Sequence, residues 1–305
     1  MIMTLTLIQM TLIIACGAAW RIIKPAGLDA EQTRRVLTSV VYYVFLPALV
    51  LDVLWSAKLG FQSLEFSLLG VSGILISLLL SWLVFRLFHL TRPQTGAMLL
   101  ATAFPNVTYL GLPVLEQAFG HWARSVAIQL DLFAAAPLVF TVGIMIARYY
   151  GEDEGEHKAM WSFLNTPPFW AAFVAVIFNL NQQTAPLWLD GVLNQLSAAV
   201  VPLMLFSLGL ALSWKTIRLH KLPYIVPVIL IQLLFMPLLV MQIASYLTMS
   251  DAYKAAAVLD MAMPSMILGI VFCDRYKLDS GLYAMAVTLT TLCSMVTLPF
   301  WFSLL

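Results

Sequence analysis

The chain has 305 residues, of which 62% are apolar and 10% are charged, and its mean hydropathy is +0.92. Soluble domains carry about a quarter charged residues, so this composition excludes an ordinary water-soluble protein. The net charge of +1 excludes no class of partner, but three scattered cysteines without a C-x-x-C pair indicate neither a disulfide framework nor a metal site.

We therefore predict an all-α integral membrane protein. A helix needs about 20 apolar residues to cross a bilayer core of about 30 Å, and ten apolar stretches are candidates. The predicted helices cover residues 2–20, 36–57, 66–88, 97–118, 125–148, 167–180, 192–213, 223–248, 253–273 and 281–304. The sixth is the shortest, and it begins at Pro167, a residue type that suits the first turn of a helix.

The basic residues favour one side of this arrangement. Of the 16 Lys and Arg residues, only Lys58, Arg124 and Lys254 fall in loops on the opposite side. Cytoplasmic loops of membrane proteins are enriched in Lys and Arg, so the rich side is predicted to be cytoplasmic. With ten crossings, both termini then lie outside, and we expect a multi-pass protein of a bacterial inner membrane.

The positions of four prolines predict two halves of five helices each. The second and fourth predicted helices carry Pro47 and Pro105, which are 58 residues apart. The seventh and ninth carry Pro202 and Pro264, which are 62 residues apart. Because each half has an odd number of crossings, the second must be inverted relative to the first. The predicted halves are residues 1–152 and 153–305.

Pro105 and Pro264 are expected to break the fourth and ninth helices. Proline has no amide hydrogen, and its ring clashes with the carbonyl group one turn earlier. Broken backbone at membrane depth is tolerated only where it is buried in protein or faces an aqueous cavity. Paired breaks at corresponding places are typical of transporter substrate sites. The alternative is that both prolines only kink packed helices.

Polar residues directly follow both prolines. A break would expose backbone amides around Asn106 to Thr108 and again near Ser265 and Met266. Helix amino termini attract negative charge through these amides and the helix dipole. We therefore predict that the two breaks meet and hold a carboxylate, without a fully charged basic side chain.

Two acidic residues, Asp131 and Asp260, lie well inside apolar stretches. A charge at the centre of a membrane helix costs about 2.5–3.5 kcal/mol on insertion scales, so such residues are functional candidates. Each is a candidate proton carrier or cation ligand, or alternatively a hydrogen-bonded acid inside a packed bundle. Gln129 adds a neutral donor near Asp131. Gln232 and Gln242 of the eighth helix are also polar, but nothing in the sequence indicates that they face the site.

Several function classes lack their sequence signatures. The four histidines fall in loops or at membrane edges, which argues against haem, a buried metal or a histidine proton relay. No Walker loop and no H-E-x-x-H motif is present, so neither an ATP-driven pump nor a metalloprotease is indicated. We expect no enzyme activity, no metal, no cofactor and no nucleic-acid partner.

Segments along nearly the whole chain resemble the auxin efflux carrier family, whose bacterial members include malate and malonate carriers. The segments follow the family's order. They are Gly17 to Leu28, Phe45 to Leu49, Asn106 to Pro113, Ala198 to Leu210, Ala262 to Ser265, Asp274 to Tyr276 and a last helix with Thr288, Thr290, Thr291 and Leu298-Pro299.

The resemblance implies a fold in which the broken fourth and ninth helices cross. Helices 1, 2, 6 and 7 would form a scaffold and the interface of a homodimer, while helices 3–5 and 8–10 would form a transport domain that moves as an elevator. The anion would bind at Pro105-Asn106 and Pro264-Ser265. Gln129 matches a glutamine that plant auxin carriers use near their substrate.

The chain departs from the family pattern at the expected site. Thr108-Tyr109 stand where Gly-Phe is common, and Leu268 stands where many bacterial members have Asn. These departures leave the substrate open, including an anion larger or less polar than malate.

The predicted function is a secondary carrier of mono- or dicarboxylates, with a small organic anion and membrane lipid as partners. One alternative is a sodium-coupled symporter of the related bile-acid type, which would need a cluster of oxygen ligands. Another is a non-transporting membrane sensor, against which stands the lack of a signalling domain.

Overall fold

All elements that the structure describes are helical. The structure is a computed structural model and describes residues 2–57, 60–152, 166–212 and 218–305. Within these ranges there is no β-strand, and the one isolated β-bridge pairs Pro105 with Ser265. The all-α prediction is confirmed for these residues. The predicted boundary between the halves falls where a described range ends, and Lys58 lies outside the described residues.

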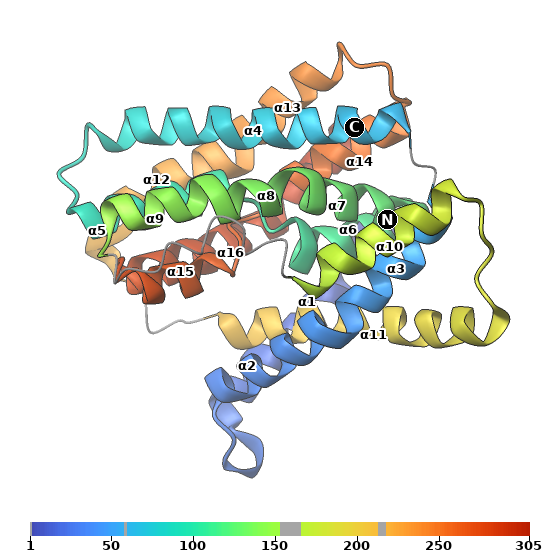
Figure 1. The fold of residues 1–305 in the computed structure, drawn as a ribbon. Helices are drawn as coiled ribbons and strands as arrows, with labels where there is room; N and C mark the ends of the chain where they lie inside the picture. Colours follow the sequence, from blue (N-terminus) through green and yellow to red (C-terminus); the bar gives the residue numbers. More distant parts are fainter. Residues whose placement is uncertain (1, 58–59, 153–165, 213–217) are drawn as a thin grey trace.

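The first half contains four helical segments that are continuous or nearly so and one that is broken (Figure 1). The first three continuous segments are α1 (Ile2–Ile23), then α2 (Ala30–Val40) continued by η2 (Val41–Phe45) and α3 (Leu46–Ser56), and then α4 (Phe61–Phe85). The fourth consists of η4 (His121–Ala123), α7 (Arg124–Leu130), η5 (Asp131–Ala135), α8 (Ala136–Leu138), η6 (Val139–Gly143) and α9 (Ile144–Tyr150). The broken one comprises α5 (Arg92–Ala103), η3 (Val107–Gly111) and α6 (Leu112–Phe119).

The chain from residue 166 onward contains, among its described residues, four unbroken helical segments and one broken segment. Its unbroken segments are α10 (Pro167–Leu180), α11 (Leu187–Ala211), the run η9 (Leu219–Lys221), α12 (Leu222–Leu230), η10 (Ile231–Phe235) and α13 (Met236–Ala244), and α16 (Ser280–Leu304). Its broken segment comprises α14 (Asp251–Met261) and α15 (Gly269–Arg275).

Six of the described helical segments are long and apolar enough to cross a membrane, judged by length and composition. They are Ala30–Ser56, Phe61–Phe85, His121–Tyr150, Leu187–Ala211, Leu219–Ala244 and Ser280–Leu304. The remaining predicted helices correspond to segments that are shorter, as in α10, or interrupted, as in α5–α6 and α14–α15. These features are those of an integral, multi-pass membrane protein.

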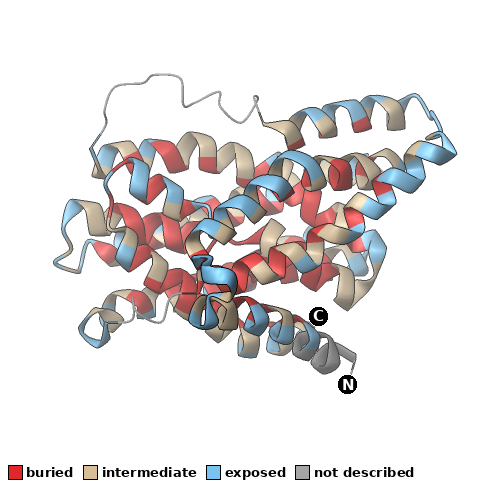
Figure 2. Cartoon of the chain, turned by 90° about the horizontal axis from the view of Figure 1, so that it is seen from below, coloured by how far each residue is buried: buried red, intermediate tan, exposed pale blue. Residues whose placement is uncertain are grey.

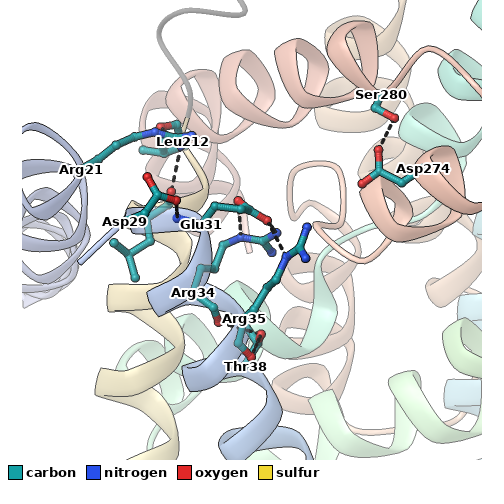
Figure 3. Close-up of polar contacts among 10 residues, drawn as sticks. Arg21, Asp29, Glu31, Arg34, Arg35, Thr38, Leu212, Asp274 and Ser280 are labelled. Atoms are coloured by element: carbon teal, nitrogen blue, oxygen red, sulfur yellow. Dashed lines mark hydrogen bonds and ion pairs between the residues drawn. The ribbon is translucent and has the colours of Figure 1, made fainter. Parts of the chain in front are cut away.

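Several helices begin earlier than predicted because polar residues cap them. The predicted helix 36–57 begins at Ala30, where the Asp29 carboxylate accepts a hydrogen bond of 3.0 Å from the Glu31 amide (Figure 3). The predicted helix 97–118 begins at Arg92, behind a capping box formed by Thr91 and Gln94. Apolar stretches mark the membrane core, whereas these caps lie beyond it.

Four π-helical turns each precede a proline. The turns are η2, η3, η5 and η10, and the prolines are Pro47, Pro113, Pro137 and Pro237. In each case the residue before the proline donates its amide to the carbonyl five residues earlier. The wider turn makes room where a proline ring would clash with the carbonyl one turn earlier. These prolines therefore stay within helices, unlike Pro105 and Pro264.

Hydrogen bonds hold together a first helix group, which consists of α1, α2–α3, α10 and α11. The Arg21 guanidinium donates to the carbonyl oxygen of Leu212 at 3.0 Å and so joins the end of α1 to the end of α11 (Figure 3). The Asn179 amide on α10 donates to the carbonyl oxygen of Ala57, after α3, at 2.7 Å. Figure 1 shows α2, α3 and α11 along the lower side of the molecule.

Two glycines let α1 and α11 touch. A Cβ atom at Gly17 would lie 2.1 Å from the carbonyl oxygen of Phe206, and one at Gly209 would lie 2.0 Å from that of Ile14. Small residues at membrane helix contacts allow such close backbone approach. Any larger residue at either position would force the two helices apart.

Other bonds hold together a second helix group, which consists of α4 to α9 and α12 to α16. The Thr248 amide donates to the Glu65 carboxylate at 2.7 Å, and the Trp301 indole donates to the carbonyl oxygen of Leu233 at 2.8 Å. These bonds tie α4 to the end of α13 and α16 to η10. Many large apolar residues are exposed, as expected for a lipid-facing surface. Figure 2 shows exposed residues, in pale blue, along the outer helices.

Candidate functional site

Two gaps interrupt the fourth and ninth helical segments. The first gap, residues 104–106, lies between α5 and η3 and contains Pro105. The second gap, residues 262–268, lies between α14 and α15 and contains Pro264. Both prolines interrupt their helices as predicted.

The two gaps cross and pair through their backbones. The Asn106 amide donates to the carbonyl oxygen of Pro264 at 2.8 Å, and the Met266 amide donates to that of Phe104 at 3.0 Å. These bonds flank the isolated antiparallel bridge. Extended backbone in a membrane needs such partners, because no water is available in the hydrocarbon region.

Side chains from neighbouring helices satisfy further groups of the second gap. The Gln232 amide on η10 donates to the carbonyl oxygen of Met263 at 2.9 Å. The Tyr283 hydroxyl on α16 donates to the carbonyl oxygen of Met266 at 2.7 Å. Both side chains are fully buried. They hold the second gap in one conformation.

Several backbone amides at the starts of the second half-helices remain without an acceptor. Among the hydrogen bonds of the described residues, none is donated by the amides of Val107, Thr108 or Tyr109 at the start of η3. The same holds for Ile267 and Leu268, directly before α15. Free amides at a helix start favour an anion.

These free amides lie slightly later in the chain than predicted. The prediction placed them at Asn106 to Thr108 and at Ser265 and Met266. The Asn106 and Met266 amides instead pair the two gaps, and the Ser265 amide donates to the Thr290 hydroxyl at 3.2 Å. The prediction was therefore wrong for these three amides, because the gaps bond to each other before their helices resume.

Both half-helix starts line one cavity of about 130 Å³. The first start contributes residues 105–109 and the second contributes residues 266–268. Polar side chains in the lining include Asn106, Thr108 and Asp131. The two half-helix starts whose amides lack an acceptor therefore line a common space.

Asp131 is bonded to the first half-helix start. The Thr108 hydroxyl donates to the Asp131 carboxylate at 2.6 Å, which leaves the other carboxylate oxygen able to accept a hydrogen bond. The side-chain amide nitrogen of Asn106 has no hydrogen-bond partner among the described residues, and Asn106 is 3% exposed. A buried donor without a partner is costly, so a ligand that accepts its hydrogen bond would bind there.

The other predicted site residues lie nearby but do not line the cavity. Ser265 and Pro264 are in the crossing itself, and Ser265 is fully buried. Gln129 is buried on α7. Asp260 is fully buried against Gly111 of η3, where a Cβ atom would lie 1.9 Å from a carboxylate oxygen of Asp260. Only a glycine at position 111 allows this contact.

Sequence reasoning missed part of the lining and the supports of the second gap. Tyr42 and Phe140 line the cavity, and Tyr283 supports the gap. Gln232 was visible as a polar residue in an apolar run, but its role was not predictable without its partner. Among the described residues, no group of three or more His, Cys, Asp or Glu side chains could hold a metal ion.

Comparison with known proteins shows close similarity to membrane transporters. The profile of a family described as membrane transport protein matches residues 3–302. A protein named uncharacterized transporter from Methanothermobacter thermautotrophicus is 31% identical over 285 residues, covering 92% of each chain. Another so named, from Methanocaldococcus jannaschii, is 28% identical over 285 residues, covering 90% of this chain and 91% of its own.

Proposed function

Because this chain belongs to the membrane transport protein family, that of the auxin efflux carriers, we propose that it is a secondary carrier of small organic anions. One observation carries this proposal: two half-helix starts with free amides face a single cavity. Oriented amides and helix dipoles stabilise a carboxylate without a basic side chain. No Lys or Arg is found among the described residues of the lining.

In the proposed site, the first half-helix start holds the carboxylate. The Asn106 side chain and the amides of residues 107–109 donate to it. Pro105 and Pro264 interrupt the two helices at the crossing, and Ser265 forms the second side of the crossing opposite Pro105. Gln129, a buried polar residue of α7, is proposed to contribute a neutral hydrogen-bond donor to the site.

The coupling role falls to the two buried acids. Asp131 is held by the Thr108 hydroxyl, so an anion bound at the Thr108 amide comes close to this carboxylate. Two neighbouring negative charges repel each other, which favours binding of the anion together with a proton on Asp131. Asp260, packed on Gly111 of the same π-helical turn, is the second candidate for ion coupling.

The proposed architecture has ten transmembrane helices in two inverted halves, residues 1–152 and 153–305. The first helix group would be a scaffold, and the second would carry the anion across the membrane as an elevator. The hydrogen bonds described above support this division, since each of them joins helices of the same group. We further propose a homodimer formed by the scaffold in a bacterial inner membrane, with both termini outside.

Transport by purified protein in lipid vesicles tests the proposed site. We expect Asn106→Ala and Pro264→Ala to insert normally and to lose most uptake of organic acids. Asn194→Ala is a matched control, because Asn194 is an exposed residue of α11 that does not line the cavity. Wild-type uptake by both site variants would refute the site.

The pH and sodium dependence of uptake distinguishes the coupling schemes. If Asp131 carries the proton, wild-type uptake increases as pH falls, and Asp131→Asn makes uptake nearly independent of pH. Replacing sodium with potassium should leave uptake unchanged. Strict sodium dependence would instead favour the sodium-coupled symporter.

A further inference from the structure

The turn between α1 and α2 carries an excess of positive charge. Residues 21–35 include four basic and two acidic side chains, which gives a net charge of +2. One of the four, Arg21, is held at the end of α11 by the carbonyl oxygens of Leu210 and Leu212. Figure 1 shows the turn and α2 extending from the lower side of the molecule. This end of the protein therefore attracts an anionic partner.

Two arginines share one carboxylate at the start of α2. The Glu31 carboxylate accepts hydrogen bonds from Nε and from a terminal nitrogen of Arg34, at 3.2 and 2.5 Å (Figure 3). Arg35 reaches the same carboxylate only through Nε, at 3.4 Å. The Arg34 side chain is 11% exposed, whereas the Arg35 side chain is 73% exposed. Because Glu31 mainly compensates Arg34, the terminal nitrogens of Arg35 have no partner among the described residues and are open to a ligand from outside the chain.

Lys24 is a second cation that forms no ion pair within the described part of the chain. Its backbone lies in the left-handed region, with a φ of 48°, directly after α1 ends. The exposed Asp29 carboxylate is close enough to interact with the charge of Lys24, but the two groups do not form an ion pair. Ile22 and Ile23, directly before Lys24, are exposed. An exposed apolar surface thus ends in an unpaired ammonium group.

The outward face of α2 and η2 is a mostly apolar stripe that begins beside Arg35. Exposed residues recur there in adjacent pairs, four residues apart, which places them on one side of the helix. After Arg35 they are Val36, Ser39, Val40, Tyr43 and Val44. From Arg35 to Val44 a helix rises about 13 Å, at about 1.5 Å per residue, and half of the hydrocarbon core is about 15 Å thick. The stripe is therefore long enough to follow most of one leaflet beneath the cation.

We propose that the α2 outer surface, which consists of Lys24, Arg35 and this stripe, binds an anionic phospholipid. The Arg35 guanidinium holds the headgroup phosphate, because its planar nitrogens match the phosphate oxygens, and an acyl chain lies along the stripe. The surface is on the side that the basic residues predict to be cytoplasmic, where anionic lipids attract such residues. A second copy of the chain fits less well, because a two-fold interface brings the same positive charge against itself, so the proposed homodimer uses other faces of the first helix group. This inference does not depend on the proposed transport function.

Native mass spectrometry of the purified full-length protein, titrated with phosphatidylglycerol or phosphatidylcholine of the same acyl chains, tests this inference. We expect phosphatidylglycerol to bind at least about tenfold more tightly, because two basic residues at a membrane surface each strengthen the attraction of anionic lipid about fivefold. Arg35→Gln should weaken phosphatidylglycerol about fivefold, and Arg35→Gln combined with Lys24→Asn about 25-fold, with phosphatidylcholine unaffected. Asparagine is chosen at position 24 because it tolerates the left-handed backbone. Glycerol 1-phosphate, which lacks acyl chains, should not displace the lipid.

The matched control is Lys277→Gln, which removes an exposed cation that Glu152 already compensates at 2.9 Å. This variant should bind both lipids as the wild type does. Equal binding of the two lipids by the wild type, or an equal loss in the control, would overturn the inference. Displacement by glycerol 1-phosphate would show a site for free phosphate esters instead of a lipid. A shift between monomer and dimer in Arg35→Gln, with lipid binding unchanged, would show that a second copy covers this surface.

Discussion

The two gaps at the crossing differ in how their polar groups are satisfied. At the first gap, the side chain of Asn106 and the amides of Val107 to Tyr109 have no partner among the described residues and face the cavity. At the second gap, Gln232 and Tyr283 bond to the carbonyl groups, and the buried Ser265 hydroxyl, which has no partner among the described residues, does not line the cavity. The carbonyl groups of the second gap are thus bonded by side chains, whereas the first gap places an unpartnered polar side chain at the cavity.

We infer from this difference that the first gap binds the ligand, whereas the side chains at the second gap stabilise its backbone. Open donors are available to a ligand, whereas donors and acceptors that already have partners fix the backbone. The second gap still adds the free amides of Ile267 and Leu268, but its side chains at the cavity are apolar. Removing the Asn106 side chain should therefore change ligand binding, and removing the side chains that bond to the second gap should change stability.

The largest effect is expected from paired variants of the polar residues after each proline. Asn106→Ala removes the open donor and should weaken anion binding about 10- to 100-fold, since a hydrogen bond to a charged group contributes about 1.5–3 kcal/mol. Ser265→Ala removes a hydroxyl that does not line the cavity and should leave the affinity nearly unchanged. Calorimetric titration of both proteins with 3-phenylpropionate measures the contrast. Equal losses would show that the gaps are equivalent.

A smaller effect, now on stability, is expected from the support of the second gap. Gln232→Leu leaves the buried carbonyl of Met263 without its donor and should destabilise the protein by about 1–3 kcal/mol. Gln242→Leu is the matched control, because Gln242 is exposed on α13. Thermal unfolding in detergent should show a lower midpoint for Gln232→Leu alone. Similar midpoints for the two variants would mean that the second gap needs no such support.

Much of the fold could be predicted because the membrane restricts backbone so strongly. Apolar length located the helical segments, and the absence of a proline amide located both gaps at Pro105 and Pro264. The pattern did not reveal why Pro47, Pro113, Pro137 and Pro237 stay inside helices. Whether a proline widens a turn or ends a helix depends on what the neighbouring backbone can bond to, which is a property of packing.

The sequence predicted several residues of the candidate site, but it did not predict how the two gaps bond to each other. Polar residues after the prolines pointed to Asn106 and Thr108, and an acid in an apolar run pointed to Asp131; these three line the cavity. The pairing of the gaps, which uses the amides of Asn106 and Met266, joins residues far apart in sequence. Likewise, nothing in the sequence distinguishes Gln232, which supports a gap, from the exposed Gln242.

The smallest effect is expected where the supporting helix α16 begins. Asp279 accepts hydrogen bonds from Lys221 at 2.9 Å, from the Leu282 amide at 2.8 Å and from Gln94 at 3.4 Å. Partial burial raises the pKa of this carboxyl group, but the bond and charge of Lys221 and the Leu282 amide outweigh it, so the pKa lies below the ordinary value of 3.8. The ionised form is therefore the one that stabilises the start of α16, the helix that carries Tyr283.

The sign of the pH dependence follows from this lowered pKa. A carboxyl group that is more acidic in the folded state stabilises it fully above its unfolded pKa, and the contribution is lost as pH falls through the folded value. Asp279→Asn retains the helix cap but loses the ion pair, and should cost about 1 kcal/mol at neutral pH and little well below pH 3.8. Asp190→Asn, at an exposed position in the first turn of α11, is the matched control with no measurable change. The loss of unfolding free energy in Asp279→Asn could instead stay constant down to acidic pH. In that case packing, and not the charge of Asp279, stabilises the start of α16, the helix that carries Tyr283.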